Sequence, residues 1–129
     1  MLAAIDERDE SHASCGELLV NAREARVIPA PVLVELDYFL TRRWGPGPMA
    51  RLLDDARRGA FEIEPLHPPD YERVSDLITT YADLRVGFVD AAVFAVVERL
   101  REPKLATLDR RHFAAMRPRH VQALTLLPA

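Results

Sequence analysis

Apolar residues in this chain follow two spacings that alternate along the sequence. Intervals of three and four predict helices over 11–25, 31–43, 49–59, 68–84, 89–101 and 110–116. Short apolar or alternating runs predict strands over 26–31, 61–66, 104–109 and 121–128. Prolines stand where several of the helices begin, and Gly59 closes the helix over 49–59.

Helices and short apolar strands in alternation are typical of the α/β class. We therefore expect a three-layer domain, in which a short parallel sheet is flanked by helices on both faces. The chain of 129 residues has the size of one compact domain, and it contains no repeat, low-complexity tract or linker, so we predict a single domain over 1–129. Only four strands are predicted, and the pattern starts with a helix, which is unusual for this class.

Composition narrows the class of protein further. Hydrophobic residues make up 49% of the chain and charged residues 29%, which is typical of a globular domain. The net charge of −3 is not that of a general nucleic-acid binder, so any such binding would depend on local arginine clusters. Because Cys15 is the single cysteine, the chain has no intrachain disulfide and no cysteine-based zinc site. These features, with no membrane-spanning run and no signal-peptide pattern, favour a cytoplasmic protein without membrane partners.

The run "VGFVDAAVFAVV" over 86–97 is apolar or small except for one carboxylate, Asp90. A buried carboxylate is costly unless something pairs with it. Two further acids stand in apolar surroundings: Glu35 in "VLVELDYFL", and Asp109 directly after the strand in "LATLDRRHF". If the three gather, they repel one another unless a divalent cation joins them, and carboxylate oxygens suit Mg²⁺ or Mn²⁺. Such a cation can activate water and stabilise charge on a reacting phosphate.

Each acid also has an ordinary structural interpretation. Asp90 could be the N-cap of its helix, Asp109 could cap the helix that follows it, and Glu35 could face solvent on a half-buried helix. Taken singly, the positions do not decide between a metal site and these alternatives. If all three acids are caps or surface residues, the chain is an ordinary α/β domain without a metal site.

Three segments in this order, "VLVEL", "YADLRVGFVDAAVFAVVERL" and "LATLDRRHF", resemble the PIN-domain ribonucleases, specifically the VapC-type toxins of bacterial toxin–antitoxin pairs. The opening "LAAIDERDESHASCGELL" is similar to the stretch that follows the first strand of those proteins, so the resemblance covers nearly the whole chain. It implies a metal-dependent endoribonuclease of a type II toxin–antitoxin system.

The resemblance also implies roles for individual residues. Glu35, Asp90 and Asp109 match the acids that bind Mg²⁺ or Mn²⁺ and cleave RNA in that family, and the Thr107 hydroxyl would be a nearby second-shell donor. The implied partners are an RNA substrate, a cognate VapB-like antitoxin and a second copy of the chain. The antitoxin is expected in a groove near the helical pair over 31–43 and 49–59.

One departure from the family pattern concerns the start of the sequence. The family begins with a strand that ends in an aspartate, the first metal ligand, and no residue here matches it. Asp6 and Asp9 lie too far along, and we interpret both as surface acids. We therefore expect a domain that is truncated at its N-terminal side relative to the family, with exposed backbone edges in the sheet and weak metal binding and catalysis. The alternative function is a catalytically impaired PIN domain that acts as an antitoxin-binding module.

Basic residues near these acids are candidate RNA contacts. Arg42 and Arg43 with Trp44 could hold phosphate and stack a base, or they could close a helix with Trp44 packed on the core. Arg110, Arg111 and Arg85 could steer RNA or be ordinary surface charges.

Two residues near Asp109 have simpler expected roles. Phe113 is predicted to be a core residue. His112 could donate to a phosphate, but we interpret it as a surface residue.

Overall fold

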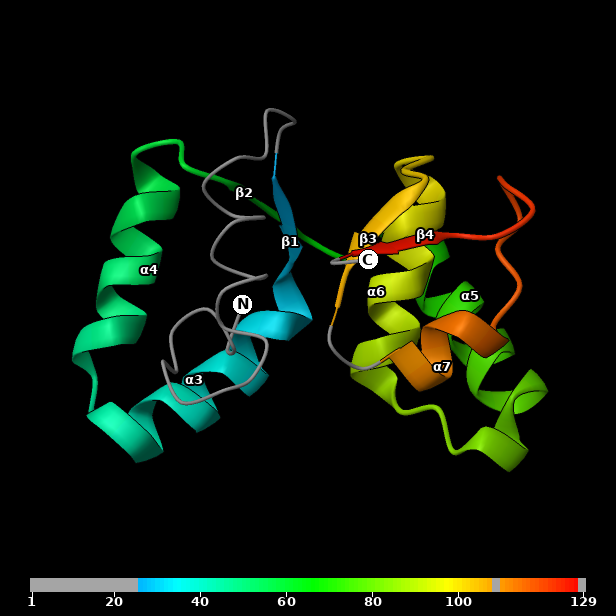
Figure 1. Cartoon of the computed structure of the whole chain (residues 1–129), viewed down its shortest axis with the longest axis horizontal. Helices are drawn as coiled ribbons and strands as arrows, with labels where there is room; N and C mark the ends of the chain where they lie inside the picture. The colour runs from blue at the N-terminus through cyan, green and yellow to red at the C-terminus, as the bar shows by residue number, and fades with distance from the viewer. Residues whose placement is uncertain (1–25, 108–109, 128–129) are drawn as a thin grey trace.

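A computed structural model describes residues 26–107 and 110–127 of the chain, drawn in Figure 1. Over these residues the chain forms five α-helices, one short 3-10 helix and four strands. The helices are α3 (Ala30–Trp44), α4 (Gly47–Arg57), α5 (Pro68–Thr80), η1 (Ala82–Leu84), α6 (Phe88–Arg99) and α7 (Arg110–Ala115). The strands are β1 (Val27–Pro29), β2 (Glu62–Glu64), β3 (Lys104–Ala106) and β4 (Thr125–Leu127).

The order of elements confirms the predicted α/β alternation, and all four predicted strands form. The predicted helix over 68–84 divides in two, because the chain leaves α5 after Thr80 and makes the short turn η1 before Arg85. The helix predicted over 11–25 lies outside the described residues.

The four strands pair in parallel, as expected, but they form two separate pairs in the part of the chain that the structure describes. β1 pairs with β2, with Ile28 opposite Ile63, and β3 pairs with β4, with Leu105 opposite Leu126. The sequence predicts one short parallel sheet, so this division is a difference from the expectation. Each strand is only three residues long. Such short pairs share few backbone hydrogen bonds, so they depend on the helices packed around them.

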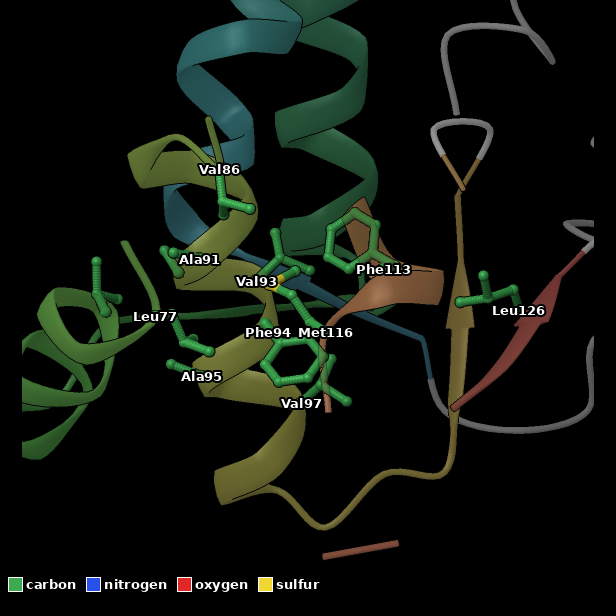
Figure 2. Packing of buried hydrophobic residues seen from close by; sticks show 12 residues of the cluster. Leu77, Val86, Ala91, Val93, Phe94, Ala95, Val97, Phe113, Met116 and Leu126 are labelled. Atoms are coloured by element: carbon green, nitrogen blue, oxygen red, sulfur yellow. The ribbon is translucent and has the colours of Figure 1, made fainter. Parts of the chain in front are cut away.

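The larger core cluster is built around α6, which confirms the predicted buried helix. Seven consecutive residues, Ala91 to Val97, are buried, and Phe94 is completely so. A helix that is apolar on every side is a core helix. Figure 2 shows Leu77 of α5 on one side of α6, and Phe113 of α7 with the following Met116 on another. Burial of a side chain such as Phe94 contributes about 1.5–3 kcal/mol to stability.

A second, smaller cluster joins α3 to α4, as the two amphipathic patterns predict. It consists of Leu36 and Leu40 of α3 with Leu52 of α4. Val32 packs against both this cluster and the one around α6, so the first turn of α3 bridges them. This contact brings the N-terminal half of α3, which carries Glu35, against α6.

The C-terminal end of α6 is fastened by two arginines. Arg99 contacts Asp70 at 3.0 Å and Glu64 at 2.8 Å, and Arg73 contacts Glu98 at 2.6 Å. These ion pairs join β2, α5 and α6, and the side chain of Asp70 is only 4% exposed. No local sequence pattern predicts this network, because its members are far apart along the chain.

None of the helices that the structure describes combines the length and the apolar character that crossing a membrane requires.

Candidate active site

Asp90 lies in the first turn of α6 and is not its N-cap. The helix begins at Phe88 after Gly87, which has the extended conformation of a capping position, and no side chain forms a capping hydrogen bond. The cap interpretation of Asp90 is therefore wrong. The carboxylate is 27% exposed, so it is accessible from outside while the residues that follow it in α6 are buried.

Glu35 of α3 approaches this carboxylate. Partial burial raises the pKa of the Glu35 carboxyl above its usual value, and the negative charge of Asp90 raises it further. Glu35 as a residue remains exposed, so the solvent-facing interpretation holds for its position on the helix. The solvent-facing and metal-site interpretations of Glu35 are compatible, because the charge of a second carboxylate can still act on an exposed one. The structure thus brings together two of the three acids that the sequence singles out.

His112 of α7 contacts Asp90 directly, so its interpretation as a surface residue is wrong. Its Nδ1 lies 2.8 Å from Oδ2 of Asp90, and its Nε2 lies 3.0 Å from the carbonyl oxygen of Leu84. The side chain is only 17% exposed. Both partners are acceptors, so a ring that carries a proton on each nitrogen donates in both contacts. No local pattern signals this contact, because it joins residues 22 positions apart.

The chain after β3 carries the other predicted site residues. Thr107 directly follows β3, and its backbone N–H donates to the carbonyl of Leu127 at 2.9 Å. Asp109 lies outside the described residues, so the expectation that it gathers with Asp90 stays a prediction. Arg110 begins α7 at the next position.

A divalent cation fits the chemistry of the acids that are described. Glu35 and Asp90 offer hard carboxylate oxygens, and neither forms an ion pair with an arginine or lysine within residues 26–107 and 110–127. A bound cation would offset the electrostatic repulsion between these two carboxylates. The same residues contain no group of three acidic, histidine or cysteine side chains placed to hold a metal. A third ligand from the chain would therefore have to come from outside them, as Asp109 would.

The arginines predicted to contact RNA divide into two groups, and the first lies at the end of α3. The guanidinium of Arg42 lies 5.2 Å from the ring centroid of Tyr38 and also donates to its hydroxyl, and that of Arg43 lies 5.1 Å from the ring centroid of Trp44. Trp44 is 40% exposed, so the alternative in which it packs on the core is wrong. The arrangement is an exposed surface of stacked cations and rings.

The second group lies on the segments that carry Asp90 and His112. Arg85 ends η1 in the left-handed conformation, with φ of 54°, five residues before Asp90. Arg110 and Arg111 are exposed in the first turn of α7. Phe113, two residues further, is 5% exposed, which confirms it as a core residue.

Comparison with known proteins decides the family. Residues 1–117 match the PIN domain family. The chain belongs to this family. Ribonuclease VapC26 of Mycobacterium tuberculosis is 33% identical to this PIN domain over 128 residues, which cover 99% of this chain and 95% of the relative. This relationship confirms the expected place among VapC-type ribonucleases.

A solved structure shares the fold of this PIN domain. The crystal structure of VapC20 from the same organism, a toxin that cleaves the sarcin–ricin loop, superimposes with a TM-score of 0.79. The match covers 93% of this chain and 92% of VapC20, at 20% sequence identity. The predicted PIN-like fold is therefore confirmed. VapC-type ribonucleases are in general metal-dependent, which agrees with the acidic composition of the candidate site.

Proposed function

We propose that this PIN domain is the endoribonuclease toxin of a type II toxin–antitoxin system, and that it hydrolyses RNA phosphodiesters beside the N-terminal end of α6. The observation that carries the proposal is the approach of Glu35 to Asp90 without an arginine or lysine partner among the described residues. VapC26 is named a ribonuclease, and VapC20 is described as a toxin that cleaves an RNA loop. Both names support RNA as the substrate of this chain.

The three acids have one proposed task, which is to hold Mg²⁺ or Mn²⁺. The cation, when bound, supplies Lewis acidity that activates water and offsets the charge on the phosphate. Asp90 stands in the first turn of α6, and its charge acts on the Glu35 carboxylate of α3, which supports a shared task for the two acids. Asp109 would complete the set from the segment after β3, with the Thr107 hydroxyl as a donor behind it.

The arginines are proposed to hold the RNA. Arg85, Arg110 and Arg111 stand on the chain segments that bear the acids or His112, so they would contact phosphates near the scissile bond. Arg42 and Arg43 lie at the other end of α3 from its first turn, with exposed aromatic rings beneath them. Stacking and cationic groups together suit single-stranded RNA.

Cognate antitoxin and a second copy of the chain remain the proposed protein partners. Large apolar side chains are exposed on α3 and α4, where the resemblance places the antitoxin groove: Val34, Tyr38, Phe39 and Leu53. Exposed apolar side chains of this size are common in protein interfaces. A VapB-like antitoxin covering them would also lie over the helix that carries Glu35.

The direct test is RNA cleavage by the purified chain with Mn²⁺, with Mg²⁺ and with a chelator. We expect cleavage that requires the metal and is lost in Asp90→Asn. Cleavage that survives both the chelator and the substitution would contradict the proposal. A chain that binds its antitoxin but cleaves no RNA under any of these conditions would instead support the antitoxin-binding module.

The arginine proposal has its own test in Arg42→Ala combined with Arg43→Ala. Both side chains lie on the surface, so the double variant should raise KM for RNA several-fold and leave kcat and the melting temperature nearly unchanged. Arg57→Ala is a matched control, because Arg57 is an exposed arginine at the end of α4.

A further inference from the structure

We infer that His112 is a positioning residue, which fixes the carboxylate of Asp90 so that one of its oxygens is held and the other stays available to the cation. The inference rests on the proposed function, since it concerns the same site. It adds a residue that is not among the expected metal ligands or RNA contacts.

The first step is the geometry of the contact. Nδ1 of His112 meets Oδ2 of Asp90 at 2.8 Å, within the range of a good hydrogen bond. The structure gives Oδ1 of Asp90 no hydrogen-bond or ion-pair partner within residues 26–107 and 110–127. The histidine therefore uses one oxygen and limits rotation of the carboxylate about its side-chain bonds.

The second step is that the imidazole itself is held. Its Nε2 contacts the carbonyl oxygen of Leu84 at 3.0 Å, so both ends of a planar ring are fixed. The neighbouring Phe113 is buried in the core, and the backbone N–H of Met116 donates to the carbonyl of His112 at 3.0 Å. A ring held in this way can orient its partner, since a positioning group must itself be fixed.

The third step compares Asp90 with acids whose role is structural. The Arg73 guanidinium occupies both oxygens of Glu98, at 2.6 and 3.0 Å. The Nε of Arg99 likewise contacts both oxygens of Asp70, at 3.1 and 3.0 Å. An arginine therefore leaves little of a carboxylate for a cation. A histidine binds through one nitrogen and leaves the second oxygen exposed to an incoming ligand.

The fourth step is the place of His112 in the sequence. It stands three positions after Asp109 and on the helix that begins directly after that residue. The contact with Asp90 therefore joins the first turn of α7 to the first turn of α6. Groups that orient metal ligands in this way commonly change metal affinity by about 10–100-fold when they are removed.

The experiment uses three substitutions of His112 that separate its two contacts. His112→Ala removes both. His112→Asn keeps an N–H near the place of Nδ1, facing Asp90, and His112→Gln keeps one near the place of Nε2, facing Leu84. The matched control is His120→Ala, because His120 also contacts a backbone carbonyl, that of Glu102 at 2.7 Å, but has no contact with Asp90.

The readouts are Mn²⁺ affinity by titration calorimetry, kcat and KM for RNA, and unfolding in urea without metal. We expect His112→Ala to lose about 10–100-fold in Mn²⁺ affinity, with kcat reduced and KM for RNA unchanged. His112→Asn should recover most of the affinity, whereas His112→Gln should not. His120→Ala should bind Mn²⁺ as the wild-type chain does.

Two results would overturn the inference alone. The first is a His112→Ala variant that binds Mn²⁺ as tightly as the wild-type chain does. The second is a His112→Gln variant that recovers as much Mn²⁺ affinity as His112→Asn does. That result would mean that the contact with Leu84 matters and the contact with Asp90 does not. Failure of the wild-type chain to bind Mn²⁺ would overturn both this inference and the proposed metal site. The urea measurement separates loss of fold from loss of affinity.

Discussion

The carboxylates near the two ends of α6 differ in the side chains that pair with them. At the C-terminal end, Glu98 is paired with Arg73, and Arg99 holds Asp70 and Glu64 from neighbouring elements. At the N-terminal end, Asp90 contacts one nitrogen of His112 and its charge acts on Glu35, with no arginine or lysine ion pair to either acid among the described residues. Within the described residues, arginines therefore neutralise the acids around one end of α6, whereas no arginine or lysine pairs with the acids around the other end.

The pKa shifts at the two ends reflect this difference. Burial lowers the pKa of Arg99, but its hydrogen bonds to Glu64 and Asp70 outweigh burial and raise that pKa overall, so the charged form is favoured. At the other end, burial and then the charge of Asp90 raise the pKa of Glu35, so its charged form is disfavoured. The first end is a completed structural network, and the second is the proposed cation site, where a bound cation would offset the repulsion between the two carboxylates.

The largest effect on stability is expected at the C-terminal end of α6, where the carboxylates are paired with arginines. Arg99→Ala leaves the buried carboxylate of Asp70 without its ion-pair partner and with only the backbone N–H of His67 as a donor, and loss of one member of a buried ion pair costs about 3–5 kcal/mol. Urea unfolding should show this loss, while the rise in melting temperature on adding Mn²⁺ should remain. A loss below about 1 kcal/mol would mean that the network contributes little to the fold.

The next effect is expected at the other end, in catalysis rather than stability. Asp90→Asn keeps the shape of the side chain but removes the charge that would face the proposed cation. We expect kcat to fall at least about 100-fold, and the free energy of unfolding without metal to change by less than about 1 kcal/mol. Cleavage assays and urea unfolding on the same preparation check both parts. An unchanged kcat would exclude Asp90 as a metal ligand.

Glu35→Gln should change stability in the opposite direction from the loss of a structural acid. Because the Glu35 pKa is raised on folding, the charged side chain destabilises the metal-free fold. The penalty is absent below the ordinary glutamate pKa, where the group is protonated in both states, and it develops as pH rises through the raised pKa. At neutral pH the variant without metal should be slightly more stable, by less than about 1 kcal/mol because the residue is exposed.

The same substitution should remove most of the stabilisation that Mn²⁺ confers. The order of stability of Glu35→Gln and the wild-type chain should therefore reverse when Mn²⁺ is added. Melting curves at acid and neutral pH, with and without Mn²⁺, test this directly. A variant that is less stable at neutral pH without metal would show that Glu35 has a structural partner.

The smallest effect is expected for an ion pair on the surface. Arg57 contacts Asp54 at 2.8 Å, but the two side chains are 72% and 40% exposed. Arg57→Ala should change the free energy of unfolding by less than about 0.5 kcal/mol, because water and salt screen an exposed pair. Urea unfolding that showed a loss comparable to that of Arg99→Ala would contradict the distinction between buried and exposed pairs.

Much of the fold could be predicted from the sequence because its cause is local. The unbroken apolar run over 91–97 predicts a buried helix, and prolines and glycines mark the ends of other elements. The split of the strands into two pairs could not be predicted, since pairing depends on which backbone edges meet. The turn after Thr80 was also missed, because the apolar spacing continues through it.

The candidate site could be predicted only in part. Asp90 and Glu35 stand out because each interrupts an apolar segment, and the structure brings them together. No sequence pattern indicates the contact between His112 and Asp90, since the two residues meet only when α7 packs against α6. The network around Arg99 was missed for the same reason, because its carboxylate partners come from β2 and α5.

The most direct test of the contrast between the two ends of α6 is a Mn²⁺ titration of the wild-type chain beside Asp90→Asn and Arg99→Ala, followed by melting temperature. A ligand that binds only the folded state stabilises it by mass action. We predict that Mn²⁺ raises the melting temperature of the wild-type chain and of Arg99→Ala, and that Asp90→Asn does not respond. An equal rise in Asp90→Asn, or no rise in the wild-type chain, would contradict the assignment of the N-terminal end of α6 as the cation site.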